Sequence, residues 1–206
     1  MQEQIKKKYY DNISIGKRTK QRVYFVAQHD KPKMFELYIK NSETKQTVVI
    51  TKSKRNADEL CAYLKTKDIQ ALAIHGNHRA EQLENAANAF NASELNILIT
   101  TDMILQALEL FNIEQIISYD TPYEYENYFK RLAYVDEVGS SILLVSPQEH
   151  NFLDIIELKM KLEIAEEKME GFVATNAQPE AKKDKKKKPR HRKLKQKEAI
   201  QKDNVT

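Results

Sequence analysis

Two polar residues, Thr101 and Asp102, stand where a binding site is expected, because they directly follow an apolar segment. That segment contains Ile97, Leu98 and Ile99, a run typical of a strand buried on both faces of a parallel sheet. In open α/β sheets, ligands bind just beyond the carboxyl ends of the strands. Thr101 and Asp102 are therefore candidates for ligand contacts. Thr and Asp are also favoured N-caps of a following helix, and the sequence leaves both roles open.

A second candidate is the cationic segment at residues 178–206. It holds ten Lys and two Arg against four acidic residues, a net charge of +8; the whole chain carries +4, so the remainder carries −4. Such a segment binds polyanions through counterion release, with little sequence specificity and a steep salt dependence. The alternative is a merely solvated charge run, and no apolar anchor adjoins it to favour a membrane surface. The candidate contacts are Lys185, Lys186, Lys187, Lys188, Arg190, Arg192 and Lys193.

The composition disfavours several classes of protein. Charged residues make up 31% and hydrophobic residues 41% of the chain, and no apolar run approaches the ~20 residues that cross a bilayer. The first residues lack the apolar core of a signal peptide. A single cysteine, Cys61, excludes an intrachain disulfide and a cysteine-based zinc site. We expect a cytoplasmic protein with no metal site and no membrane partner.

Short apolar segments alternate with helical patterns along the chain, which predicts a parallel sheet with helices on both faces. Strands are expected at 23–26, 47–50, 71–74, 97–99, 116–119 and 141–145, and helices at 33–40, 56–65, 79–90, 103–110, 123–132 and 147–169. These elements predict four parts: a loosely docked polar arm at 1–20, an α/β domain at 21–146, a long C-terminal helix at 147–173, and a disordered Lys/Arg-rich tail at 174–206.

Five segments resemble, in order and spacing, the second RecA-like domain of DEAD-box RNA helicases. They are Thr47–Leu60, Ala73–Gly76 with Phe90 fifteen residues after His75, Ile97–Asp102, Ile117–Pro122 and Tyr128–Arg131. The resemblance extends over roughly residues 22–172 and implies a RecA-like fold. A Gly-x-x-x-x-Gly-Lys-Ser/Thr phosphate loop and an Asp-Glu-Ala-Asp box do not occur in this sequence, so we expect the first RecA-like domain to be absent from it.

The resemblance implies RNA contacts at three places. Ser53, Lys54 and Arg55 match the segment that touches the RNA backbone, and Thr101-Asp102 matches the pair that contacts phosphate. His75-Gly76 matches the His-Gly turn. The alternatives are a solvated helix start at Ser53–Arg55 and a turn without chemistry at His75-Gly76. No catalytic residue is predicted, and the basic tail becomes a candidate for RNA binding.

The segments that face ATP in the family depart from its pattern. Ala80 and Leu83 replace a Gln and an Arg, for which Arg79 and Gln82 are possible partial substitutes, and Leu105–Glu109 replaces Ala-Arg-Gly-Leu-Asp. Tyr134 and Glu137 replace two arginines. Because an arginine finger is worth ~10³–10⁵ in rate, we expect no self-sufficient ATP hydrolysis.

Two residues remain as candidates for cofactor binding: Glu109, and Arg131, for which a structural ion pair is the alternative. ATP and Mg²⁺ are expected only if a partner supplies a first RecA-like domain.

The sequence therefore predicts a helicase-like RNA-binding protein that lacks its own ATPase chemistry, acting as an RNA chaperone or accessory factor. One alternative is the C-terminal half of a split ATP-dependent helicase, completed by a partner in trans. Another is a protein-interaction module in which the sheet domain is the docking surface. Whether the chain has enzymatic activity is left open.

Overall fold

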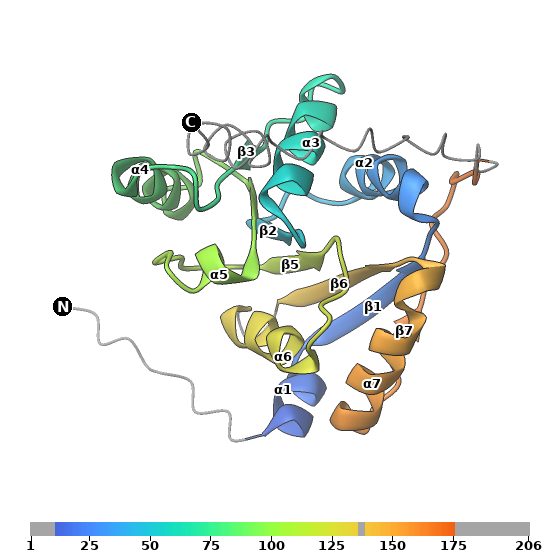
Figure 1. Ribbon diagram of the computed structural model, residues 1–206. Helices are drawn as coiled ribbons and strands as arrows, with labels where there is room; N and C mark the ends of the chain where they lie inside the picture. Colours follow the sequence, from blue (N-terminus) through green and yellow to red (C-terminus); the bar gives the residue numbers. More distant parts are fainter. Residues whose placement is uncertain (1–10, 136–138, 176–206) are drawn as a thin grey trace, which may run out of the picture. The chain divides into compact units, whose positions relative to one another are not determined.

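The computed structural model describes residues 11–135 and 139–175, which fold around a parallel sheet (Figure 1). The strands are β1 (Lys20–Phe25), β2 (Thr47–Ile50), β3 (Leu72–Ala73), β4 (Ile97–Thr100), β5 (Gln115–Ser118), β6 (Ser140–Val145) and β7 (Ala165–Glu166). The seven strands run in the order β3-β4-β2-β5-β6-β1-β7, and every pairing is parallel. The α/β fold predicted from the sequence is confirmed.

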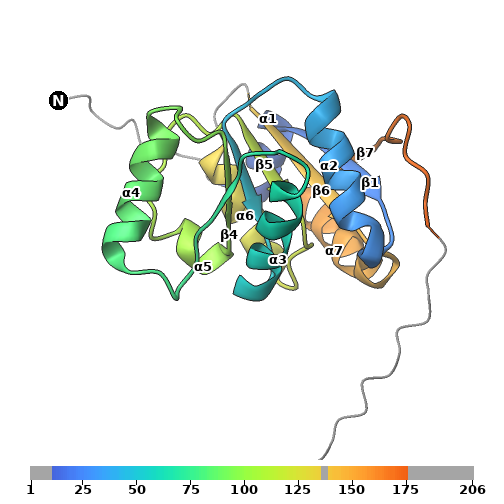
Figure 2. The ribbon, with the colours of Figure 1, turned by 90° about the horizontal axis from the view of Figure 1, so that it is seen from above.

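Helices cover both faces of this sheet, as Figure 2 shows from above. They are α1 (Asn12–Arg18), α2 (Lys31–Asn41), α3 (Lys54–Lys65), α4 (Ala80–Asn91), α5 (Asp102–Leu105), α6 (Tyr125–Tyr134) and α7 (His150–Met160), with 3₁₀ turns η1 (Gln28–Asp30) and η2 (Pro147–Glu149). None of the helices in the described ranges is long and apolar enough to span a membrane.

The core has two layers because successive strand residues point to opposite faces. Val49 packs with the apolar sides of α2 and α3 on one face. Its neighbour Val48 packs with α4 and α5 on the other. On that second face, Val23 and Leu143 pack with α1, α6 and α7. The central strands are buried on both sides, which explains their uninterrupted apolar sequences.

The register of the strands brings three chain segments to one edge of the sheet. Ile50 in β2 pairs with Thr100 in β4 and with Ser118 in β5. The residues that follow these strands therefore emerge side by side at the carboxyl edge. Here the fold places the candidate site.

The prediction of a loosely docked polar arm at 1–20 is wrong for its second half, because residues 12–18 form helix α1. Asp11 caps the helix, its Oδ1 accepting from the Ser14 N–H at 2.7 Å. Ile15 is buried against α6 and α7, and Arg18 donates to the Leu132 and Val135 carbonyls at 2.9 and 3.0 Å. A single buried apolar residue was too weak a pattern to predict a helix.

The long helix expected from residue 147 onward is also wrong. Helix α7 ends at Met160, and Lys161 takes the left-handed conformation with φ of 54°. The Glu157 carboxylate then accepts from the Ile164 N–H at 2.7 Å, and Ala165–Glu166 pairs with β1 as strand β7. The helix predicted at 103–110 is likewise shorter, ending at Leu105. Of the tail expected at 174–206, residues 176–206 lie outside the described part of the chain.

Candidate nucleic-acid interface

A cavity of about 510 Å³ opens at the carboxyl edge of the sheet, beyond strands β2, β3 and β4. It is lined by Thr51, Lys52, Ser53, Lys54, His75, Gly76, Asn77, Thr101, Asp102 and Met103. Six of the seven body residues predicted to bind RNA thus lie together. Arg55 is the exception: its exposed guanidinium pairs with Glu59 one turn further along α3, at 2.7 Å.

The loop from Thr51 to Lys54 forms one wall of the cavity. The Thr51 N–H donates to the Thr100 carbonyl at 2.9 Å, and its hydroxyl donates to the Ser53 carbonyl at 3.1 Å. Ser53 is the N-cap of α3, with its Oγ accepting from the Asn56 N–H at 3.2 Å. The N-terminus of α3, whose first N–H groups lack partners within the helix, therefore opens on the cavity. Such an end favours anions.

The Ser53 hydroxyl also donates, to the Asn56 Oδ1 at 2.8 Å. Its one proton is thereby directed toward the helix. Lys54 Nζ donates to the Oδ1 of Asn77, in the turn after β3, at 3.0 Å. The side chain of Lys52 is 40% exposed, and its Nζ lies 3.8 Å from the Oδ1 of the buried Asp120. Both lysines thus line the cavity, and Lys52 is paired with a carboxylate behind it.

The turn after β3 forms the second wall. His75 is buried, and its Nε2 lies 2.9 Å from the Asp58 carboxylate on α3. Its ring packs against that of His78, with centroids 4.3 Å apart. A Cβ on Gly76 would meet Met103 at 3.8 Å, an ordinary contact, so packing does not require glycine there. These contacts give His75 a structural role beside the cavity.

Thr101 and Asp102 form the third wall, at the start of α5. Within residues 11–135 and 139–175, the Thr101 side chain makes no capping hydrogen bond. Both oxygens of Asp102 accept from Arg131 on α6, at 2.7 and 2.8 Å. The same buried guanidinium donates to the Ser118 hydroxyl at 2.8 Å and to the Asp120 carbonyl at 3.1 Å. Arg131 thus forms the structural ion pair that was the alternative expectation.

The remaining candidates for nucleotide contact do not assemble into one site. Glu109 is exposed and lines a separate depression of about 430 Å³ with Asn91 and Phe111. Tyr134 packs against the apolar cluster that Val48 forms with α4 and α5, and burial raises the pKa of its phenol. The N–H groups of Arg131 are bonded to acceptors within the protein. Glu109, Tyr134 and Arg131 therefore do not form a phosphate-binding site. Glu137 lies outside the described residues. So do the tail candidates Lys185, Lys186, Lys187, Lys188, Arg190, Arg192 and Lys193.

The Gln82 side chain is also engaged, because it accepts from the Arg79 N–H at 2.9 Å at the start of α4. The two possible substitutes for the family's Gln and Arg are therefore bonded to each other. Within the described ranges, no group of three or more His, Cys, Asp or Glu could hold a metal ion.

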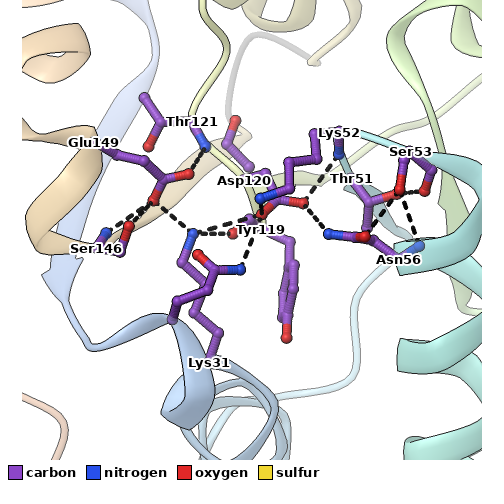
Figure 3. A network of polar contacts seen from close by, with 12 residues as sticks. Lys31, Thr51, Lys52, Ser53, Asn56, Tyr119, Asp120, Thr121, Ser146 and Glu149 are labelled. Carbon is purple, nitrogen blue, oxygen red and sulfur yellow. Dashed lines mark hydrogen bonds and ion pairs between the residues drawn. The ribbon is translucent and has the colours of Figure 1, made fainter. Parts of the chain in front are cut away.

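Behind the cavity lies a buried polar network that the sequence did not reveal (Figure 3). Lys31 is fully buried at the start of α2, and its Nζ donates to the Glu149 carboxylate at 2.7 Å and to the Tyr119 carbonyl at 2.8 Å. Burial lowers the pKa of Lys31, and the attraction of Glu149 opposes that shift. Asp120, 1% exposed, connects this network to the cavity loop. The sequence did not reveal this role of Lys31, because a lysine before Pro32 in a polar segment indicates only the start of a helix.

Residues 30–133 match the family of the helicase conserved C-terminal domain. The match covers half of the chain, and the chain belongs to this family. The fold is that of the RecA-like second domain of DEAD-box RNA helicases, as the sequence resemblance implied.

Two relatives and two structures illustrate the similarity. The chain is 27% identical over 150 residues to the DEAD-box ATP-dependent RNA helicase RhpA of Helicobacter pylori, covering 71% of this chain and 30% of the relative. It is 31% identical over 123 residues to the ATP-dependent RNA helicase vasa of Drosophila melanogaster, covering 59% and 18%. The chain thus spans less than a third of the length of either.

A DEAD box protein from Methanococcus jannaschii superposes with a TM-score of 0.69 at 27% identity, covering 75% of this chain and 43% of that one. Domain 2 of the Mss116p DEAD-box helicase, bound to an RNA duplex, superposes with a TM-score of 0.63 at 21% identity, covering 72% and 64%. The second comparison concerns the fold alone.

Proposed function

We propose that this helicase C-terminal domain binds the phosphate backbone of RNA in the cavity beyond β2, β3 and β4. The observation that carries the proposal is the convergence there of Lys52, Lys54, the N-terminus of α3 and the Thr101 side chain. The Lys54 ammonium and the helix N-terminus favour phosphate, and Lys52, 40% exposed and paired with Asp120, adds a second cation. The Asp102 carboxylate is neutralised by Arg131, so it adds little repulsion. Membership of a family whose relatives are named RNA helicases supports RNA as the polyanion.

We further propose that the chain does not hydrolyse ATP by itself and serves as an RNA chaperone or accessory factor. The relatives are named ATP-dependent, but Arg131 is internally engaged and Glu109 lies in another depression. The basic segment near the C-terminus adds a second, less specific RNA contact in this proposal.

The test is fluorescence anisotropy of a labelled ten-nucleotide oligouridylate, titrated with the full chain between 50 and 300 mM KCl. Lys54→Met and Lys52→Met should each weaken binding and reduce the slope of log K against log salt by about 0.7, the value for one phosphate contact on a single strand. Lys65→Met, at the opposite end of α3, is the matched control and should leave both quantities unchanged.

Two outcomes would overturn parts of the proposal. Unchanged affinity in Lys52→Met and Lys54→Met, with loss of binding on replacing Lys185–Lys188 by Gln, would place all RNA binding in the tail. RNA-stimulated ATP hydrolysis by the chain alone would refute the ATPase proposal. Hydrolysis that appears only on adding a protein with a phosphate loop would favour a split helicase instead.

A further inference from the structure

The buried carboxylate of Asp120 joins the cavity loop to the neighbouring strand. Its Oδ2 accepts from the Lys52 N–H at 3.0 Å and from the Asn56 Nδ2 at 3.2 Å (Figure 3). Asp120 follows β5, whereas Lys52 and Asn56 lie beyond β2. One carboxylate therefore holds both the loop backbone and the first turn of α3.

Asn56 links Asp120 to Ser53, which lines the cavity. Its Nδ2 donates to Asp120, which fixes the amide orientation so that Oδ1 accepts from the Ser53 hydroxyl. Ser53 in turn caps the helix that opens on the cavity. The positions of Ser53 and of its neighbours Lys52 and Lys54 thus depend on a carboxylate that does not line the cavity.

Asp120 itself is held from the other side by the Lys31 network. Lys31 Nζ lies 3.7 Å from the Asp120 Oδ1 and donates to the carbonyl of the preceding residue, Tyr119. Glu149 accepts from the Thr121 N–H at 3.2 Å, and from the Ser146 N–H and hydroxyl at 2.9 and 2.7 Å. The residues on both sides of Asp120 are therefore fixed to α2 and to the end of β6.

We infer that Asp120 is a positioning residue for the RNA-phosphate site. It orients the Lys52–Lys54 loop through Lys52 and Asn56 and has no contact with RNA, because it is buried. This inference rests on the proposed function of the cavity. Lys31 and Glu149 complete the support on the far side of Asp120. The site therefore depends on residues of α2, of the loop after β5 and of η2 that lie outside it.

The experiment compares Asp120→Asn with Asp30→Asn in the full chain. Both aspartates are buried, but Asp30 accepts from Thr175 at 2.8 and 2.5 Å and makes no contact with the cavity loop. Urea unfolding gives the folded fraction of each variant, and oligouridylate anisotropy gives its affinity. We expect Asp120→Asn to weaken binding about three- to tenfold, the equivalent of one net hydrogen bond, and Asp30→Asn to leave it unchanged once folding is corrected for.

A double-mutant cycle separates positioning from stability. If Asp120 positions Lys54, the loss caused by Lys54→Met should shrink in the Asp120→Asn background. Additive losses, or equal effects of Asp120→Asn and Asp30→Asn, would overturn the inference while leaving the cavity proposal intact. Unchanged binding in Lys54→Met alone would overturn both.

A second variant covers the case in which Asp120→Asn does not fold. Asn56→Ala keeps the buried carboxylate and its bond to the Lys52 N–H, but removes the link to Ser53. It should weaken oligouridylate binding in the same direction and show the same non-additivity with Lys54→Met. Wild-type affinity in Asn56→Ala would overturn the inference.

Discussion

The ion pair between Arg131 and Asp102 gives the sharpest prediction about stability. Arg131 is 2% exposed and makes four hydrogen bonds, two to the Asp102 carboxylate and one each to Ser118 and the Asp120 carbonyl. Replacing Arg131 by Met removes all four and leaves the carboxylate without its cation. Breaking a buried pair in this way costs about 3–5 kcal/mol. Because the Asp102 side chain is 27% exposed and water can hydrate it, we expect the lower end, about 3 kcal/mol.

Arg131→Lys should cost less, because one cation remains near the carboxylate. Lysine has three donors on a single nitrogen and cannot make the two parallel bonds. The loss of one charge-assisted hydrogen bond corresponds to about 1.5–3 kcal/mol. The neighbouring Lys130→Met is the control. Lys130 donates to the Asn127 Oδ1 at 3.4 Å on an exposed surface, so its replacement should change the free energy of unfolding by no more than about 0.5 kcal/mol.

Urea unfolding followed by circular dichroism measures these free energies, with Asp102→Asn completing a double-mutant cycle. We expect a coupling energy of at least about 1 kcal/mol between positions 102 and 131. Wild-type stability in Arg131→Met would refute the structural role. A nucleotide-contact role predicts the opposite pattern, with stability preserved and ATP binding lost.

Two further predictions concern the edges of the domain. Burial, together with the hydrogen bond to Glu167, raises the pKa of Tyr24 to about 12, so the folded protein keeps a proton that the unfolded chain loses above pH 10. Its contribution to stability is therefore complete below pH 10 and lost as the pH rises toward 12, and Tyr24→Phe should flatten this decline in urea unfolding whereas the exposed Tyr123→Phe should not. Gly16→Ala should destabilise the protein by about 1–2 kcal/mol, because a Cβ would clash with the buried Met160 Sδ and the cost of overpacking exceeds the gain in helix propensity. An unchanged melting temperature would show that Met160 moves aside freely.

The sequence was sufficient to predict six of the seven strands and most of the residues that line the cavity, for an identifiable physical reason. Strands buried on both faces leave apolar runs, and the polar residues that follow them, such as Thr101 and Ser53, share one edge in any parallel sheet. The register of β2 with β4 then brings those residues together without further information.

The features that escaped prediction depend on long-range contacts. Lys31 meets Tyr119 and Glu149 across 88 and 118 residues, and no local pattern marks such pairings. The apolar spacing of α7 continues through Leu162 and Ile164, so the pattern did not reveal where the helix ends and β7 begins. Arg131 matched a phosphate-contacting position by its place in the motif, while its actual partners became visible only in three dimensions.

The sheet order has a consequence for synthesis on the ribosome. The first strand of the described residues, β1, pairs with β6 in a register that matches Lys20 with Ser140, 120 residues later, and then with β7. At ~5–20 residues per second, β1 waits on the order of 6–24 s for its first strand partner to be translated. During that interval its hydrogen-bonding edges are open to other chains, so the nascent protein is most prone to misassociation before its C-terminal third emerges.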